Sequence, residues 1–347
     1  MRQKRKEEHI DLANVGDNAS TRLEDVLLIP QSISDINWEE IDLKTSFLNK
    51  TLSLPIIINA ITGGTKRAAR INAKLAKIAK NYNIPMAVGS QTIAIEIPEL
   101  ADTFTIARQE NPAGVIIANI SAFTKSDSML KAIDMIEADA IQIHFNIPQE
   151  LAMLEGDRNF KGVIKNVREL VDNSPVPVIA KEVGFGFSKE AIELLYNAGV
   201  RFFDISGAGG TNFIAIEDAR QGMFAGSFNS WGIPTAWSLV EALSLEIPIC
   251  VISSGGIRTA LDITKSLALG ANYVGMANWF LQLVLNNTDE EVANKLDNLI
   301  YCLKASLLMC GAKNIFELQK KPVIILGQTK DYLQARGIDT SLWSARN

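Results

Sequence analysis

The sequence has few of the residues that build disulfide frameworks or cysteine-based metal sites. Its 347 residues include three cysteines, Cys250, Cys302 and Cys310, and two histidines, His9 and His144. The cysteines show no paired ligand spacing and lie in apolar surroundings, where thiols usually act as small hydrophobic side chains. We therefore expect no chemistry from cysteine, and the two histidines are the only side chains that titrate near neutrality without a shifted pKa.

Long apolar runs and an excess of positive charge are also missing. No apolar stretch reaches the roughly 18 residues that a membrane-spanning helix needs. The first nine residues lack the apolar core and cleavage site of a secretory signal. A net charge of −5 argues against general nucleic-acid binding, which uses a broad basic face. We expect a cytoplasmic protein without a membrane or nucleic-acid partner, in which any anion site is local.

Short β-branched apolar runs recur along the chain, each followed by a segment with helical spacing. Eight such runs occupy residues 55–59, 85–89, 114–119, 140–144, 176–181, 201–206, 247–253 and 271–275. Helical spacing covers residues 68–81, 126–138, 189–198 and 259–269, and Gly199 and Gly270 stand where helix C-caps are expected. Strands buried on both faces that alternate with helices indicate a parallel sheet, and eight units favour a closed (β/α)₈ barrel.

A doubly wound open sheet is the alternative fold. It would usually carry a Gly-x-Gly-x-x-Gly turn after its first strand, where residues 59–64 of this chain read Asn-Ala-Ile-Thr-Gly-Gly. We predict one domain over 1–347, with an N-terminal extension (1–50), the barrel (51–310) and a C-terminal segment (311–347). The long excursion at 208–238, after the sixth run, is expected to form a lid or a pocket wall.

Barrel enzymes place their reacting groups at the carboxyl ends of the strands. Polar or glycine residues follow all eight runs here; they are Thr62, Ser90, Gln91, Asn119, His144, Asn146, Gln149, Glu150, Lys181, Ser206, Thr211, Gly255, Gly256, Arg258 and residues 275–278. The loops at 253–258 and 275–278 combine glycine-rich backbone with a helix N-terminus, as in the usual phosphate site of a barrel. The alternative is that these glycines only make tight turns.

Two strand ends carry unusual groups. A buried lysine such as Lys181 needs an anion or an electron-rich ring, and either the N1 region of a reduced flavin or the neighbouring Glu182 would serve. Residues 144–150 bring together one imidazole, two amides and one carboxylate, and Glu150 is a candidate Mg²⁺ ligand. The charged run at 5–9, Arg-Lys-Glu-Glu-His, is by itself more typical of a solvated tail.

These segments together resemble the type 2 isopentenyl diphosphate isomerases, which are FMN-dependent (β/α)₈ barrels. The resemblance covers Arg5 to about Gly311, through residues 5–9, 59–64, 88–91, 144–150, 155–158, 181–184, 207–211 and 254–258. It implies that the basic side chains of the N-terminal run bind the substrate diphosphate; the substrate set is Arg5, Lys6, His9, Ser90, Gln91, Thr92 and Gln149. Thr92 departs from the pattern, because some members carry a phosphate-binding arginine there.

The resemblance also implies cofactors and roles. FMN contacts are expected from Ala60, Ile61, Thr62, Ser90, Asn119, Lys181, Ser206, Thr211, Gly255, Gly256, Arg258, Ala277 and Asn278. Glu150 would bind Mg²⁺ that bridges the diphosphate, and Gln149 would touch the isoprenoid chain, with His144 and Asn146 beside it as further catalytic candidates. A homo-oligomer, either a tetramer or an octamer, is the expected assembly.

The implied activity converts isopentenyl diphosphate to dimethylallyl diphosphate by a 1,3-proton shift, in isoprenoid biosynthesis. Protonation of the alkene develops positive charge on a tertiary carbon, which an electron-rich ring in a dry site would stabilise. Reduced FMN would act as an acid–base reagent, and NADPH would only reduce it initially. One alternative is an FMN oxidoreductase of the 2-hydroxyacid oxidase or IMP dehydrogenase type. The chain has neither the central His of the oxidases nor the central Cys of IMP dehydrogenase at the expected place. The other alternative is a non-catalytic FMN-binding barrel.

Overall fold

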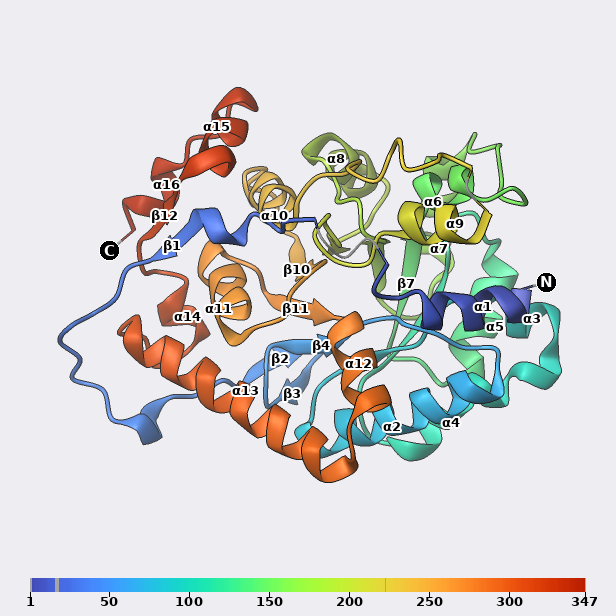
Figure 1. Cartoon of the computed structure of the whole chain (residues 1–347), viewed down its shortest axis with the longest axis horizontal. Helices are drawn as coiled ribbons and strands as arrows, with labels where there is room; N and C mark the ends of the chain where they lie inside the picture. The colour runs from blue at the N-terminus through green and yellow to red at the C-terminus, as the bar shows by residue number, and fades with distance from the viewer. Residues whose placement is uncertain (1, 16–18, 222, 347) are drawn as a thin grey trace.

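A closed barrel of eight parallel strands forms the centre of the protein (Figure 1). The computed structural model describes residues 2–15, 19–221 and 223–346. The barrel strands are β4 (Ile56–Ile58), β5 (Met86–Ala87), β6 (Ile116–Ser121), β7 (Ala140–Phe145), β8 (Val178–Glu182), β9 (Phe202–Asp204), β10 (Cys250–Ser254) and β11 (Tyr273–Met276). They follow one another in chain order, and β11 pairs with β4 to close the ring. The predicted (β/α)₈ barrel is confirmed, because an open sheet would leave two unpaired edges.

Helices follow the strands and cover the outside of the barrel (Figure 1). They are α2 (Lys66–Tyr82), α3 (Thr92–Glu96), α4 (Asp102–Glu110), α5 (Ser126–Met135), α6 (Ile147–Ala152), α7 (Val163–Asn173), α8 (Lys189–Asn197), α9 (Phe213–Gln221), α10 (Thr235–Leu243), α11 (Ala260–Leu269), α12 (Asn278–Asn286) and α13 (Asp289–Met309), with a 3-10 turn η3 (Pro98–Leu100). None of the described helices combines the length and the apolar character needed to cross a bilayer.

Local chemistry sets the ends of the predicted helices. The Thr65 side chain accepts a hydrogen bond from the Ala68 N–H at the start of α2, and Thr259 and Asp262 form a capping box at the start of α11. Gly270 ends α11 with a φ of 131°, as its predicted C-cap role requires. Helix α5 ends three residues before the predicted position 138, and Glu137 adopts a left-handed φ of 47° in the turn that follows.

The amino end of the barrel is closed by a hairpin of β2 (Thr45–Phe47) and β3 (Lys50–Leu52). Phe47 is buried there, with its ring 4.9 Å from that of Tyr273 and 6.1 Å from that of Phe202. Inward-facing apolar side chains such as Ile57 and Ile179 pack in the same cluster. This packing leaves the carboxyl ends of the strands as the place for a binding site.

The two terminal segments pair with each other outside the barrel. Strand β1 (Val26–Leu28), which follows η1 (Leu23–Asp25), runs antiparallel to β12 (Val323–Ile325). The Asp25 carboxylate accepts hydrogen bonds from the Thr329 N–H and hydroxyl in α15 (Gly327–Ala335). The remaining elements are α1 (Arg2–Asp11), η2 (Trp38–Glu40), α14 (Ile315–Leu318) and α16 (Ser341–Ser344). The pairing of β1 with β12 is consistent with one domain over 1–347, and the single domain remains a prediction.

Candidate active site

A cavity of about 1230 Å³ opens at the carboxyl ends of the strands. Its walls come from the loops after the barrel strands and from α1, which lies across this end of the barrel (Figure 1). The predicted site residues that line it are Arg5, Lys6, His9, Ala60, Ile61, Thr62, Ser90, Thr92, Asn119, His144, Asn146, Gln149, Glu150, Lys181, Ser206, Thr211, Gly255, Gly256, Arg258, Ala277 and Asn278. The predicted wall at 208–238 contributes Gly210, Thr211 and Phe213.

Gln91 is the one predicted site residue that does not line the cavity. Its side chain is fully buried, its Nε2 donates to the Ala132 carbonyl at 2.8 Å, and its Oε1 accepts from the Asn119 N–H at 3.0 Å. The amide therefore joins the loop after β5 to β6 and α5. Its predicted place in the substrate pocket is not supported, because position after a strand end does not tell which way a side chain points.

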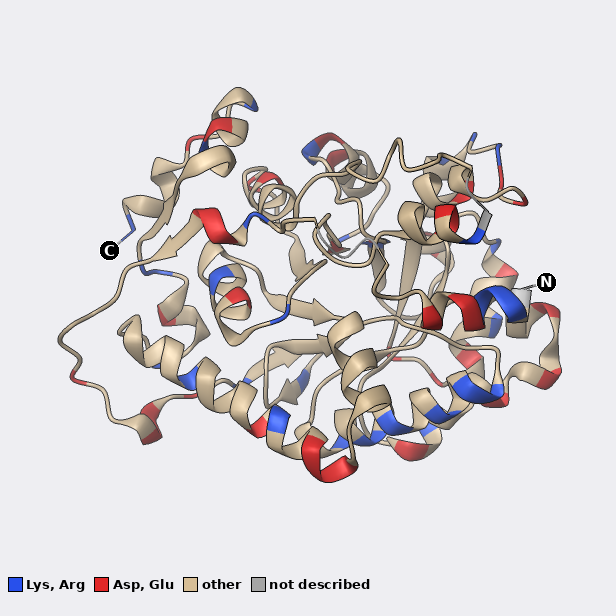
Figure 2. Ribbon diagram, in the orientation of Figure 1, with Lys and Arg blue, Asp and Glu red and all other residues tan. Residues whose placement is uncertain are grey.

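Helix α1 carries its basic residues towards the N-terminus and its acidic residues further along (Figure 2). Arg5 and Lys6 line the cavity, and Lys6 Nζ donates to the Ser90 carbonyl at 3.4 Å. The acidic residues attach α1 to neighbouring helices. Glu8 accepts a hydrogen bond from Arg220 Nε of α9, and Asp11 accepts one from Arg67 Nη1 of α2, both at 2.6 Å. The charged run predicted as either tail or site is therefore a helix fixed over the cavity.

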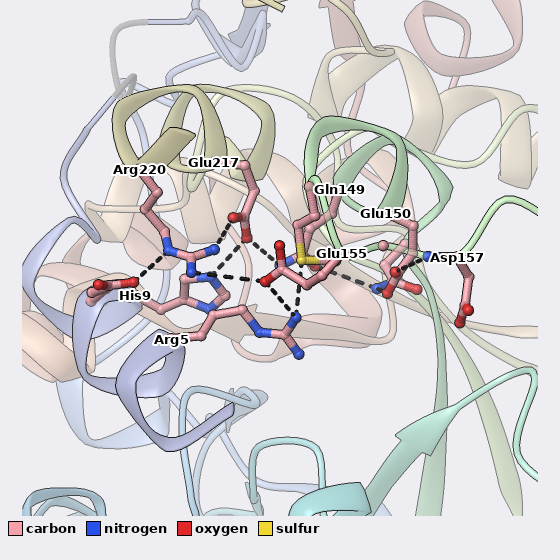
Figure 3. Close-up of polar contacts among 12 residues, drawn as sticks. Arg5, His9, Gln149, Glu150, Glu155, Asp157, Glu217 and Arg220 are labelled. Carbon is pink, nitrogen blue, oxygen red and sulfur yellow. Dashed lines mark hydrogen bonds and ion pairs between the residues drawn. The ribbon is translucent and has the colours of Figure 1, made fainter. Parts of the chain in front are cut away.

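A buried carboxylate, Glu217 of α9, connects α1 with the segment after β7 (Figure 3). Its Oε1 lies 2.8 Å from His9 Nε2 and accepts from Gln149 Nε2 at 3.2 Å, and its Oε2 accepts from Arg220. Burial would raise the pKa of Glu217, but these donors hold it below its usual value. Burial lowers the pKa of His9, and the hydrogen bond and negative charge of Glu217 act in the opposite direction.

Arg5 lies opposite a second carboxylate. Its Nη1 is 3.6 Å from Glu155 Oε1 and donates to the Met153 sulfur at 3.1 Å. Arg220 Nη2 approaches the same Glu155 oxygen at 3.9 Å (Figure 3). The Glu155 carboxylate thus lies between two guanidinium groups at the edge of the cavity.

The Glu150 carboxylate, the candidate ligand for a hard metal ion, is held by two N–H donors. One carboxylate oxygen accepts from Asn146 Nδ2 at 2.7 Å, and the other accepts from the Asp157 N–H at 2.9 Å. Within the described ranges, no three His, Cys, Asp or Glu side chains come together as a metal cluster. Glu150 can therefore hold Mg²⁺ only together with oxygens from a ligand or water, which is the usual manner for this ion.

Lys181 forms its ion pair with Asp204, at 3.2 Å from Nζ to Oδ2, and both side chains are buried. Its Nζ also donates to the Glu182 carbonyl at 3.0 Å. The Glu182 carboxylate instead accepts from the backbone N–H groups of residues 183–186. The alternative pairing of Lys181 with the Glu182 side chain is therefore wrong, and Lys181 reaches the cavity beside a second buried acid.

The remaining histidine is neutral. Burial, with Lys6 and Lys181 nearby, lowers the pKa of His144 to about 3. Its Nδ1 lies 2.9 Å from Asn119 Oδ1. A ring with such a pKa carries no charge at physiological pH and cannot neutralise a phosphate.

Several groups around the cavity have no partner of their own and suit a phosphate-bearing ring system such as FMN. Thr62 Oγ1 and Asn146 Oδ1 are buried without a hydrogen-bond partner among the described residues. The backbone N–H groups of Gly256, Ile257 and Trp279 likewise have no acceptor in the described part of the chain. Unpaired N–H donors at two adjacent loops suit an anion, and the phosphate site at these loops stays a prediction.

The glycines of the seventh loop also serve the fold. Gly255 and Gly256 have φ values of 98° and 74°, and a Cβ on Gly255 would lie 2.1 Å from the Gly207 carbonyl oxygen. Arg258 donates to the carbonyls of Gly256 at 2.7 Å and Gly209 at 3.0 Å, which joins the loops after β9 and β10. These glycines therefore make tight turns, and the predicted phosphate role of the loop stays a prediction.

Comparison with known proteins decides the family. The chain is 44% identical to the isopentenyl-diphosphate delta-isomerase of Moorella thermoacetica, over 96% of this chain and 97% of that protein. It is also 44% identical to the isomerase of a Geobacillus species and 43% identical to that of Listeria innocua, over 99% and 98% of this chain and 99% and 96% of those proteins. The chain belongs to the isopentenyl-diphosphate delta-isomerase family. A model of FMN-dependent dehydrogenases also matches residues 149–325 of this family member.

Solved structures that resemble this isomerase family member include a mandelate oxidase with 3,3-difluoro-2-hydroxy-3-phenylpropionic acid. Its TM-score is 0.68 at 16% identity, over 92% of this chain and 95% of the oxidase. The complex of mandelate oxidase with (S)-2-phenylpropionate gives a TM-score of 0.65 at 17% identity, over 92% and 90%. At such identities the likeness concerns the fold alone.

Sequence reasoning missed three residues that organise the site: Asp204, Glu217 and Arg220. Glu217 and Arg220 lie three positions apart on α9, inside the excursion that was predicted only as a wall. Asp204 lies inside the sixth apolar run, where an acid among buried residues is itself a signal that a partner is needed.

Proposed function

We propose that this member of the family isomerises isopentenyl diphosphate to dimethylallyl diphosphate, in isoprenoid biosynthesis, by a 1,3-proton shift that uses reduced FMN. The observation that carries the proposal is the contact between Gln149 and the buried Glu217 carboxylate at 3.2 Å. It places an uncharged, oriented amide beside the basic residues of α1, which is where an alkene diphosphate would have its carbon chain. An FMN oxidoreductase would have no evident use for that arrangement.

The amide of Gln149 has a fixed direction. Glu217 is ionised and can only accept, so the Gln149 NH₂ group faces it and Oε1 faces away. Asn146 Nδ2 lies 3.5 Å from that Oε1. Oε1 can therefore accept a proton or orient one near the allylic carbon without adding a full negative charge that would trap the cationic intermediate.

The cofactor assignment rests on the groups already described. Thr62, Asn119, Lys181, Ser206 and Thr211 would hold the ring system, while the N–H groups of the seventh and eighth loops would bind the phosphate; the further proposed contacts are Ala60, Ile61, Ser90, Gly255, Gly256, Arg258, Ala277 and Asn278. Bound reduced FMN supplies an electron-rich ring and an exchangeable proton beside the developing positive charge. NADPH is proposed only as the initial reductant.

Mg²⁺ is proposed to bind Glu150 and the diphosphate together. Glu150→Gln removes the negative charge, and we expect the Mg²⁺ concentration for half-maximal rate to rise by about tenfold or more. The measurement is a Mg²⁺ titration of the isomerisation rate. Glu169→Gln, an exposed carboxylate on α7 that pairs only with Lys165 among the described residues, controls for the change in net charge. A Glu150→Gln titration that overlays the parent's would make Glu150 a structural residue.

Glu155 competes with the diphosphate for Arg5. Glu155→Gln releases the guanidinium, so we expect the KM for isopentenyl diphosphate to fall by roughly two- to fivefold, as suits a partly exposed ion pair. The effect should shrink at high salt, because such pairs are screened. KM is measured at two ionic strengths, again against Glu169→Gln. A raised KM would show that Glu155 assists binding instead.

The tests that separate the functions are direct. The purified protein, loaded with FMN and Mg²⁺ under strictly anaerobic conditions, should form dimethylallyl diphosphate when the flavin is reduced and not when it is oxidised. A non-catalytic barrel would bind FMN without forming product. A 2-hydroxyacid oxidase would need a histidine after the sixth or seventh strand, but residues 206–211 and 253–258 contain none, and no cysteine precedes Cys250 to act as in IMP dehydrogenase.

A cytoplasmic homo-oligomer, a tetramer or an octamer, is also part of the proposal. Exposed apolar side chains support it: Tyr301 and Met309 on α13 and Phe316 on α14 are each more than half exposed. Such side chains are common where copies of a chain meet.

A further inference from the structure

A row of buried hydrogen bonds crosses the barrel beneath the cavity and ends at His144. Asn59 Nδ2 donates to Asp204 Oδ2 at 2.6 Å, and Gln142 Nε2 donates to Asn59 Oδ1 at 2.9 Å and to Asp204 Oδ2 at 3.4 Å. Asn119 Nδ2 donates to Gln142 Oε1 at 3.0 Å, and Asn119 Oδ1 lies 2.9 Å from His144 Nδ1. Asp204, Asn59, Gln142 and Asn119 are at most 3% exposed.

The Asp204 carboxylate at the start of this row decides which atom is the donor and which the acceptor in every bond that follows. The Asp204 carboxylate, paired with Lys181, can only accept, so the amide nitrogens of Asn59 and Gln142 must face it. The Ala60 N–H donates to Asn59 Oδ1 at 2.9 Å, which fixes the Asn59 amide a second time.

The same logic runs on to the imidazole. With its nitrogen directed to Asp204 and Asn59, Gln142 has only Oε1 left for Asn119, and this must accept from Asn119 Nδ2. Asn119 then presents Oδ1 to the ring, and an oxygen can only accept.

We propose that Asp204, Asn59, Gln142 and Asn119 are positioning residues that hold His144 in the tautomer with its proton on Nδ1, so that Nε2 offers a lone pair to the cavity. The ring then accepts a hydrogen bond from its neighbour in the site. The proper partner is an N–H, O–H or ammonium donor, and a phosphoryl oxygen is excluded. Two ammonium groups, those of Lys6 and Lys181, are close enough to act on the ring electrostatically.

This assignment changes the role expected for His144. A ring without a proton on Nε2 neither binds the diphosphate through that atom nor supplies the proton that reaches the alkene. It can orient the ammonium of Lys6 or a ring N–H of the bound cofactor. The inference rests on the proposed isomerase function only for this consequence, because the tautomer itself is a property of the folded chain.

Nitrogen-15 solid-state NMR of the FMN-loaded protein, labelled at histidine, tests the proposal without use of the reaction. Only two histidines contribute, and a His9→Gln variant assigns their signals by subtraction. At neutral pH we expect the Nδ1 of His144 to show the shift of a protonated nitrogen and Nε2 that of an unprotonated one. A proton on Nε2 in the parent protein would overturn the proposal, whatever the activity.

Two matched variants test the row itself. Gln142→Met breaks the link between Asp204 and Asn119, and we expect His144 to show a mixture of tautomers or the opposite one. Gln91→Met removes an equally buried amide that contacts the Asn119 backbone but lies outside the row, and it should leave the tautomer unchanged. An unchanged tautomer in Gln142→Met, or an equal change in both variants, would contradict the role of the row. If Gln142→Met does not fold, the parent spectrum still decides.

Discussion

Gln149→Leu should lower the single-turnover isomerisation rate about a hundred- to a thousandfold, the 2.7–4 kcal/mol typical of a polar contact made mainly in the transition state. Leucine keeps the approximate volume but removes the amide that Glu217 orients. Substrate affinity should change far less than kcat, because the ground state does not depend on proton transfer. The measurement uses prereduced FMN and saturating Mg²⁺.

Glu217→Gln is the companion variant for this prediction. It keeps the shape of the side chain but lets both amides reverse, so kcat should fall while the Gln149 side chain is still present. A Gln149→Leu rate within about threefold of the parent would leave Gln149 as a wall of the cavity only. A Glu217→Gln rate equal to the parent's would show that Glu217 does not orient Gln149 for the reaction.

Lys181→Met should weaken FMN binding and make the flavin harder to reduce, because a positive charge that favours the reduced, anionic ring is lost. It should also destabilise the fold by about 3–5 kcal/mol, since it leaves the Asp204 carboxylate buried without its ion-pair partner. Reduction potential, FMN affinity and the free energy of unfolding in denaturant are the three measurements.

The double variant Lys181→Met with Asp204→Asn separates these effects. Removing both charges should recover most of the lost stability, while the flavin potential stays low. Recovery of the potential along with the stability would show that Lys181 acts on the fold and not on the flavin. An unchanged reduction potential in Lys181→Met alone would likewise show that Lys181 does not act on the flavin.

The barrel could be predicted from sequence because its signal is local. Each of the eight apolar runs overlaps one barrel strand, and strands buried on both faces need only β-branched side chains and a following helix to be recognised. The hairpin β2–β3 and the pairing of β1 with β12 were not predicted. Each of these strands has three residues, which is too short for periodicity to stand out.

The site residues that stand at strand ends could be identified from the sequence. Those whose role depends on a partner far away in the sequence were missed. Lys181 was identified as a buried cation, but its partner Asp204 lies 23 positions away in the next strand, and only the barrel brings them together. Glu217 and Arg220 meet α1 across more than 200 positions. The buried side chain of Gln91 does not line the cavity, because a strand end gives the place of a residue but not the direction of its side chain.

The fate of the reducing equivalents tests the central claim most directly. The FMN-loaded protein is reduced once, the excess reductant is removed, and isopentenyl diphosphate is added without oxygen while flavin absorbance and product are followed together. The isomerase account predicts many molecules of dimethylallyl diphosphate per flavin, with the flavin still reduced at the end. Oxidation of the flavin together with a reduced product, limited to one molecule per flavin and formed in place of dimethylallyl diphosphate, would contradict it and favour an oxidoreductase.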